Sequence, residues 1–574
     1  MERTVTSISG TAAFGRSAVS RVMLRLALAA AILVAVAARA DGAQAIIEGV
    51  PDYCQEHFEG SNDCAPVACA NVLGYWDSHG RPDMIDGSSD FATNAAGVTA
   101  LVDRLKLRMF WTPAGTEIDL ISRGITNTAA DRGYFFESRN QYRASWADFT
   151  GEIDAHRPLV FTISHSKFGG YHSTAGIGYD DTDGTRRVIL HDVWLPTGHL
   201  HLNFDECLGP VIATAVPKVY VDDDAPHDPA PGDPEISDPR EDGSEDHPYD
   251  SIQKGLENGG DGVIIVVRSG LYRGRGNRDL DFMGKASVLC GEGGPTSCII
   301  RCDGSEDEPH RAFCFNGQPA GIVQNFTITG GYADEGGAVY SRGSAPVFRN
   351  CIFSGNRALR GGAFYGDSSR AELINCTLAD NSAGHSGGAV YSTGSGPTIA
   401  DCIAWGNSPD QLYGEIGPVS YSVVQGGWDG VGNVDGDPLF AAPPADYHVM
   451  SVFGRWQPES GAWLYDAATG AGVDAGDPAA ACPLEPDPGN GQGRVNAGAY
   501  GNTPEASRNA HWWSVPGDVN DDCVVNVLDL IFVRNHLTWQ NSGGGMWKAD
   551  VNGDGCVSIL DLIFVRNRMG TACK

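Results

Sequence analysis

The middle of the chain repeats itself about every 25 residues. One recurring pattern is a short apolar run with a cysteine near its end, and the other is Gly-Gly-Ala followed by Val-Tyr or Phe-Tyr. The repeated cysteines are Cys351, Cys376 and Cys402, and the glycine patterns occupy 336–340, 361–365 and 387–391. A period of this size, with short strands and glycine turns, is typical of solenoids. Stacked repeats would bring the cysteines together as an interior ladder, so we interpret them as core residues and not as metal ligands.

These repeats resemble those of right-handed parallel β-helix proteins, and the Gly-Gly-Ala pattern is similar to that of polymorphic outer-membrane proteins. The resemblance implies a β-helix with its C-terminal cap over residues 248–510. Pectin lyases share this fold, so a polysaccharide lyase or hydrolase is one alternative. The acidic residues Asp334, Glu335, Asp367 and Asp380 are scattered over separate predicted turns. We therefore favour a role in binding a glycan or a cell surface.

A twelve-residue loop pattern occurs twice near the C-terminal end. Oxygen-bearing side chains stand at positions 1, 3, 5, 9 and 12 and a main-chain carbonyl at position 7, a spacing that wraps a calcium ion. The predicted ligands are Asp518, Asn520, Asp522, Val524, Asn526 and Asp529 in the first loop, and Asp550, Asn552, Asp554, Cys556, Ser558 and Asp561 in the second. A nearly identical apolar segment with helical spacing follows each loop, at 527–535 and 559–567.

This duplicated loop and helix resembles a type I dockerin over residues 516–574. The resemblance implies two bound calcium ions and docking to a cohesin module on a scaffold protein, rather than catalysis. The alternative is a calcium-clamped cap that stabilises the chain without a partner.

Near the N-terminal end, Cys64 stands at the predicted start of an Ala-rich helix. Main-chain amides and the helix dipole at such a position favour the thiolate and would lower the pKa of the thiol. Gln55, shortly before it, could donate a hydrogen bond to an oxyanion. About a hundred residues further on, His172 enters a predicted strand and Asp192 follows the next one. A hairpin of these strands would place the imidazole beside the carboxylate, as a base and its orienting group require.

This ordered set of residues resembles the papain-like cysteine peptidases of the bacteriocin-processing type, in their stand-alone form, over residues 46–217. The resemblance implies a peptide substrate, Cys64 as nucleophile, His172 as general base, Asp192 as orienting residue and Gln55 as oxyanion donor. The alternatives are a disulfide from Cys64 to Cys54, Cys69 or Cys207, a buried structural role for His172, and a turn role for Asp192.

The sequence pattern at the N-terminal end predicts that the protein is exported. An apolar run from Leu26 to Ala38 follows Arg21 and Arg25, and translation could begin at Met1 or Met23. We predict a signal peptide over residues 1–45 and a secreted protein, held at a scaffold or cell surface, with no membrane span in the mature chain. The net charge of −32 disfavours nucleic acid as a partner. Fifteen cysteines leave at least one unpaired within the chain in an oxidising compartment.

Residues 218–247 are rich in Asp, Glu and Pro, which predicts an extended, solvated linker. The expected fold is therefore multidomain: an α+β papain-like domain, an all-β parallel solenoid and a small α-helical calcium-binding dockerin. The leading hypothesis is a secreted thiol peptidase tethered to a cohesin scaffold, with a β-helix that binds a glycan or a surface. The alternatives are a non-catalytic, scaffold-bound recognition protein and a polysaccharide lyase or hydrolase acting through the β-helix.

Overall fold

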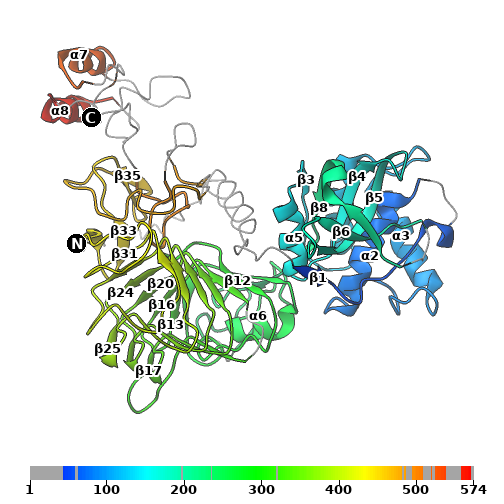
Figure 1. Cartoon of the computed structure of the whole chain (residues 1–574), viewed down its shortest axis with the longest axis horizontal. Helices are drawn as coiled ribbons and strands as arrows, with labels where there is room; N and C mark the ends of the chain where they lie inside the picture. Colours follow the sequence, from blue (N-terminus) through cyan, green and yellow to red (C-terminus); the bar gives the residue numbers. More distant parts are fainter. Residues whose placement is uncertain are drawn as a thin grey trace, which may run out of the picture.

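The structure is a computed structural model. It describes residues 43–58, 62–194, 198–233, 236–317, 321–480, 482, 484–486, 494–508, 519, 524–537 and 557–570. These residues form an N-terminal α+β domain, a central solenoid of parallel strands and a C-terminal pair of helices (Figure 1). The predicted signal peptide lies almost wholly outside the described residues. None of the helices in the described ranges is both long and apolar enough to cross a membrane.

The N-terminal domain packs helices against a twisted antiparallel sheet (Figure 1). Its helices are α2 (Cys64–Ser78), α3 (Ala95–Arg108), α4 (Ile121–Ala130) and α5 (Trp146–Asp154), with short 3-10 turns η1 (Gln55–His57), η2 (Ile118–Leu120) and η3 (Phe204–Glu206). The sheet order is β3 (Asn140–Tyr142), β8 (Leu208–Ala213), β4 (Leu159–His165), β5 (Gly170–Asp180), β6 (Arg187–His191) and β7 (Leu200–Asn203), and β1 (Gln44–Ile46) also pairs with β5. Every residue of α2 from Ala65 to Asp77 is buried, because this apolar helix lies between the sheet and α3.

One strand joins the N-terminal domain to the solenoid. β9 (Val216–Val221) pairs antiparallel with β2 (Phe136–Glu137) of the N-terminal domain and parallel with β10 (Ile264–Val267) of the solenoid. The domain boundary expected after residue 217 therefore falls inside a strand. Its first residues pair with the N-terminal domain and its later residues pair with the solenoid.

The acidic segment after β9 is folded, which differs from the extended, solvated linker that its composition predicts. Tyr249 donates a main-chain hydrogen bond to Tyr220 at 2.9 Å, and Tyr220 donates one to Gly243 at 2.9 Å. Within the segment, Asp228 and Asp238 accept bonds from amides two residues further on. These aspartates form turns rather than solvated coil, and the segment returns to cover β9.

The solenoid is built from parallel sheets whose strands pair with the next coil along the chain. In order, the first sheet continues from β9 and β10 through β12 (Val288–Gly291), β15 (Ile322–Gln324), β19 (Val347–Arg349), β23 (Glu372–Ile374), β27 (Thr398–Ala400) and β30 (Val419–Ser420). The second contains β11 (Gly270–Arg273), β13 (Cys298–Arg301), β16 (Thr327–Thr329), β20 (Ile352–Ser354), β24 (Thr377–Ala379), β28 (Ile403–Trp405) and β31 (Val423–Val424). Two more contain β14 (Phe313–Asn316), β18 (Val339–Arg342), β22 (Phe364–Asp367), β26 (Val390–Thr393) and β29 (Leu412–Gly414), and β17 (Tyr332–Glu335), β21 (Arg357–Arg360) and β25 (Ser382–Ser386).

Equivalent side chains stack from coil to coil. Cys351, Cys376 and Cys402 are fully buried, and the amide of Cys376 lies 3.3 Å from the sulfur of Cys402. The predicted interior ladder of cysteines is therefore confirmed. On the outside, Tyr340, Tyr365, Tyr391 and Tyr413 form a second ladder, with successive ring centroids 5.6, 5.4 and 5.5 Å apart.

Both ends of the solenoid are covered. The amphipathic helix α6 (Ile252–Gly259) buries Ile252 and Leu256 against the first coil. After the last coil come two hairpins, formed by β32 (Phe440–Ala442) with β33 (Asp446–Val449) and by β34 (Arg455–Gln457) with β35 (Ala462–Leu464). The chain then returns along the solenoid, where the Tyr500 hydroxyl lies 3.0 Å from that of Thr296.

The C-terminal helices α7 (Val527–Asn535) and α8 (Ile559–Asn567) pack on a small shared core. That core contains the buried side chains Val519, Val525, Val533, Val557 and Val565. The near-identical sequences of the two helices thus give a two-fold repeated unit. Beside the cap, the rings of Phe564 and Tyr465 lie 4.9 Å apart.

Candidate active site

Cys64 is the first residue of α2, as the sequence predicts. Pro66 occupies the first turn, where its missing N–H is not needed. The Cys64 sulfur lies close to the amide and the hydroxyl of Ser173 on β5, and Ser173 directly follows His172. The packing of α2 on β5 therefore places the thiol beside Ser173, the strand residue that follows His172 in the chain.

Burial changes the charge state that the sequence suggests for this thiol. The pKa of Cys64 is raised above its usual value, mainly by burial, while the amides of Ser173, Ala65 and Cys64 itself act in the opposite direction. The expectation of a lowered pKa is therefore not met in this structure. The amides are present, but desolvation of the thiolate outweighs them because α2 lies under the sheet.

His172 is oriented by a main-chain carbonyl. Its Nε2 lies 2.7 Å from the carbonyl oxygen of Asp192, and since a carbonyl only accepts, Nε2 carries the proton and Nδ1 is the basic nitrogen. The ring is 4% exposed and packs between Phe168 and Trp194, each with a centroid distance of 4.5 Å. Burial lowers the pKa of His172, and the Asp192 carbonyl and charge oppose that shift.

Asp192 lies beside His172, but the bond to the imidazole comes from its backbone. Its carboxylate Oδ1 accepts a 3.0 Å bond from the amide of Trp194. The hairpin of β5 and β6 that the sequence predicts is present. The main-chain carbonyl of Asp192 thus bonds to the imidazole, while its carboxylate closes the turn after β6.

Val193 connects this turn to Gln55. It has a positive φ of 58°, an unfavourable backbone conformation for a β-branched residue. In that conformation its carbonyl accepts a 2.7 Å hydrogen bond from the amide of Gln55. Gln55, which is half-buried at the start of η1, is thereby attached to the segment that orients His172.

The alternatives raised by the sequence can be compared with these positions. Cys54, Cys64, Cys69 and Cys207 are all free. His165, another histidine close to His172 in sequence, lies at the end of β4 with Nε2 3.7 Å from a carboxylate oxygen of Glu206. Ser173, Val193, Phe168 and Trp194 are site residues that the sequence analysis did not identify, although each lies within four residues of His172 or Asp192.

Some predicted calcium ligands lie outside the described residues, namely Asp518, Asn520, Asp522, Asp550, Asn552, Asp554 and Cys556. The others are described: Val524, Asn526, Asp529, Ser558 and Asp561. Asp529 is fully buried and accepts 2.8 Å bonds from the amides of Val519 and Asn526. Asp561 is equally buried and accepts a 2.7 Å bond from the amide of Ser558. A buried carboxylate at the twelfth position of each loop is the type of ligand that a hard cation prefers.

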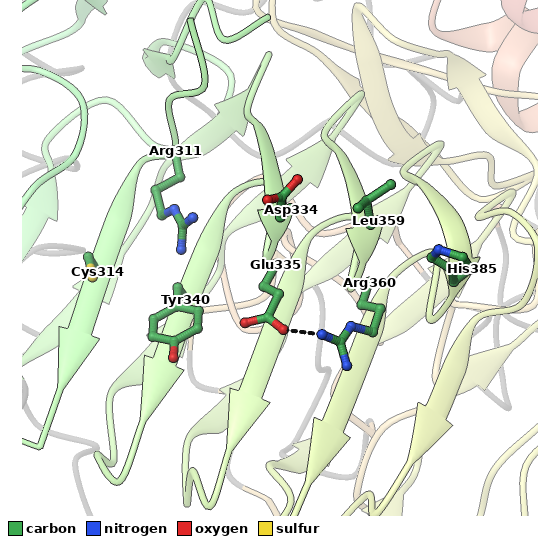
Figure 2. Close-up of a pocket in the computed structure, with 8 residues that line it drawn as sticks. All are labelled: Arg311, Cys314, Asp334, Glu335, Tyr340, Leu359, Arg360 and His385. Carbon is green, nitrogen blue, oxygen red and sulfur yellow. Dashed lines mark hydrogen bonds and ion pairs between the residues drawn. The ribbon is translucent and has the colours of Figure 1, made fainter. Parts of the chain in front are cut away.

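A groove on the outer face of the solenoid gathers polar side chains from neighbouring coils (Figure 2). It has a volume of about 780 Å³. Glu335 on β17 forms an ion pair with Arg360 on β21, and Asp334 and Arg311 lie nearby (Figure 2). Asp334 and Glu335 lie on β17 rather than in a turn, and Glu335 meets Arg360 because β17 and β21 pair in parallel register.

Tyr340, the first residue of the tyrosine ladder, lines this groove. The Arg311 guanidinium lies 5.2 Å from the ring centre of Tyr340, and that of Arg360 lies 5.6 Å from those of Tyr365 and Tyr391. Two further acidic residues, Asp367 and Asp380, bond elsewhere, to Arg342 and to the Tyr447 hydroxyl. The groove therefore presents charged side chains and an aromatic ring. Of the four acidic residues considered from the sequence, it contains Asp334 and Glu335.

Comparison with known families divides the chain into the same order of parts. Residues 47–204 match a family model described as Peptidase C39 like family, residues 288–423 one described as right handed beta helix region, and residues 516–570 one described as Dockerin type I domain. No curated protein matches the sequence. Among solved structures, active wild-type interpain A cysteine protease from Prevotella intermedia aligns with 30% of this chain and 94% of its own, at 13% identity and a TM-score of 0.23.

Proposed function

For a chain that joins a C39-like peptidase region, a right-handed β-helix and a type I dockerin in that order, we propose the function of an exported thiol peptidase tethered to a cohesin-bearing scaffold. Cys64 attacks the peptide carbonyl carbon, and Nδ1 of His172 takes the thiol proton and then gives it to the leaving amine. The Gln55 side chain and the Cys64 amide stabilise the oxyanion. Water, deprotonated by His172, hydrolyses the acyl-enzyme and restores the thiol.

The observation that carries the proposal is the fixed tautomer of His172. Because Nε2 donates to the Asp192 carbonyl, Nδ1 is the basic nitrogen, and in the proposed mechanism it takes the proton of Cys64. Asp192 acts as a positioning residue and its charge stabilises the imidazolium that forms during the reaction. Burial favours the uncharged forms of Cys64 and His172 in the resting protein. This observation supports the competing role, that of a non-catalytic recognition protein on the scaffold.

The deciding experiment compares the full-length wild-type chain with Cys64→Ala on a mixture of peptides analysed by mass spectrometry. The matched control is Cys69→Ala, which removes a fully buried thiol from the same helix. Cleavage by the wild type and by Cys69→Ala, with none by Cys64→Ala, is the expected result. Equal cleavage by all three chains, or cleavage by none, would assign this domain to recognition rather than catalysis.

The dockerin supplies the tether in this proposal. Two calcium ions, held by the ligands predicted above, order its loops, and α7 and α8 present equivalent apolar side chains to a cohesin. Ile531 and Ile563 are about two-fifths exposed and line a shared surface groove. Exposed apolar residues at repeated positions are a typical binding surface. Proteins with this module act outside the cell, which agrees with the proposed export.

The β-helix is proposed to bind a glycan or cell surface through the groove of Figure 2. Tyrosine edges, guanidinium groups and carboxylates together can bond to the many hydroxyl groups of a carbohydrate. A lyase or hydrolase acting here is the second candidate, and the joined pair of Glu335 and Arg360 is the observation that favours it. Release of shortened sugars from a bound polymer would distinguish cleavage from simple binding.

A further inference from the structure

Asp250 is a buried acidic residue at the junction between the acidic segment and the solenoid. It lies just before α6 and is 2% exposed. Neither of its side-chain oxygens has a hydrogen-bond partner of normal geometry among the described residues, and the neighbouring Ser237 side chain acts to lower its pKa. A buried carboxylate is normally paired with a cation or bonded to several donors.

Other carboxylates surround this group. The main chain of Val221 pairs with Tyr249, and the Asp222 amide donates to the Tyr249 carbonyl at 3.0 Å, which places Asp222 beside Asp250. In Asp228, Oδ1 accepts a 2.8 Å bond from the Ala230 amide, but the buried Oδ2 has no hydrogen-bond partner among the described residues. Three buried oxygens on two neighbouring acids thus remain without donors.

The electrostatics of the cluster agree with this arrangement. Burial and the charges of Asp228, Asp238 and Asp222 raise the pKa of Asp250 to about 6. Burial and the neighbouring acids likewise raise the pKa of Asp223 to about 7. Asp238 differs from Asp250, because its oxygens accept bonds from His247 at 2.7 Å and from the Arg240 amide at 3.0 Å.

We propose that Asp250 and Asp228 bind a calcium ion at the junction between the peptidase domain and the β-helix. The available ligands are oxygens, which a hard cation prefers, and calcium accepts six to eight of them from carboxylates, carbonyls and water. In the described ranges no three His, Cys, Asp or Glu side chains converge on one point. Main-chain carbonyls and water therefore complete the coordination, as the flexible geometry of calcium permits.

The position of this site has a structural consequence. The acidic segment folds between β9, which both domains share, and the start of α6, which covers the first coil. A cation that neutralises Asp250 and Asp228 holds this segment closed. Calcium then stabilises the connection between the two domains, independently of the calcium bound by the dockerin.

The binding test counts calcium ions in the full chain. Asp529→Asn with Asp561→Asn weakens both dockerin sites, and calcium chloride binding to this variant is measured by equilibrium dialysis up to millimolar concentration, since extracellular modules bind with Kd on the order of 10⁻⁴–10⁻³ M. We expect about one remaining ion per chain, lost when Asp250→Asn is added. The control is Asp246→Asn, an exposed acid of the same segment, which should retain the ion. Absence of the remaining ion, or its persistence in Asp250→Asn, would overturn the proposal.

A stability measurement distinguishes a calcium-binding role of Asp250 from a purely structural one. In EGTA, Asp250→Asn should raise the thermal midpoint of the β-helix transition, because it removes an unpaired buried charge. In calcium, the wild type should be the more stable of the two. A thermal midpoint that is higher for Asp250→Asn than for the wild type, both in EGTA and in calcium, would contradict the proposed calcium site.

Discussion

The amide of Gln55 donates a 2.7 Å hydrogen bond to the carbonyl of Val193, which joins Gln55, the proposed oxyanion donor, to the turn that orients His172. Val193 accepts this bond in a left-handed backbone conformation. Such strain costs of order 1–3 kcal/mol and persists where the surrounding structure holds it. The preceding carbonyl, that of Asp192, is directed at His172, so one strained turn positions both sides of the site.

Asp192→Asn tests whether the carbonyl or the carboxylate orients the base. The substitution retains the backbone bond to His172, so we expect kcat/KM to fall by less than about tenfold, against a loss of about 10²–10⁴ for His172→Ala. Loss of the negative charge should also lower the pKa of His172 further, because that charge now raises it. Peptide turnover against pH measures both effects. A loss as large as that of His172→Ala would show that the carboxylate is essential.

The reactivity of Cys64 should rise with pH into the alkaline range. Burial raises the pKa of this thiol above its usual value and lowers that of His172. The uncharged forms of both residues are therefore favoured, and the reactive thiolate fraction grows about tenfold per pH unit. Iodoacetamide labelling from pH 5 to alkaline pH, followed by peptide mapping, measures this. A rate that is already maximal in acid would instead indicate a preformed thiolate–imidazolium pair.

Arg311→Ala should weaken glycan binding in the solenoid groove. Its guanidinium lies in the groove beside Tyr340, and loss of hydrogen bonds from a charged donor corresponds to about tenfold or more in affinity. Affinity electrophoresis in polysaccharide gels gives the measurement. The matched control is Arg342→Ala, which breaks an ion pair with Asp367 away from the groove residues. Equal retardation of Arg311→Ala and the wild type would place binding elsewhere.

Ile531→Asp combined with Ile563→Asp should abolish cohesin capture. Each change introduces a charge into an exposed apolar surface of α7 or α8, and that charge would have to be desolvated on docking. Surface plasmon resonance with immobilised cohesins tests this prediction. Calcium binding and helix content should remain, because Asp529 and Asp561 are untouched. Undiminished cohesin capture would show that the interface does not include this surface of α7 and α8.

The cysteine ladder should tolerate a smaller side chain better than a larger one. Cys376 is fully buried between Cys351 and Cys402, so Cys376→Val overpacks the coil and should lower the unfolding free energy by about 1–3 kcal/mol. Cys376→Ala removes one heavy atom and should cost about 0.5–1.5 kcal/mol. Denaturant melts compare the two. The opposite order would mean that the coil interior has room at this position.

The sequence by itself determined the order and type of the parts. The 25-residue repeat, the helix that begins at Cys64 and the duplicated loop before α7 and α8 are local patterns, and local patterns are set by side-chain periodicity and turn residues. Tertiary structure alone decided the pairing of Asp192 through its carbonyl, the raised pKa of Cys64, the gathering of Asp334 and Glu335 with Arg360, and the enclosure of Asp250. These features depend on register between distant strands and on burial, because desolvation and charge proximity are properties of the packed chain and not of neighbouring residues in sequence.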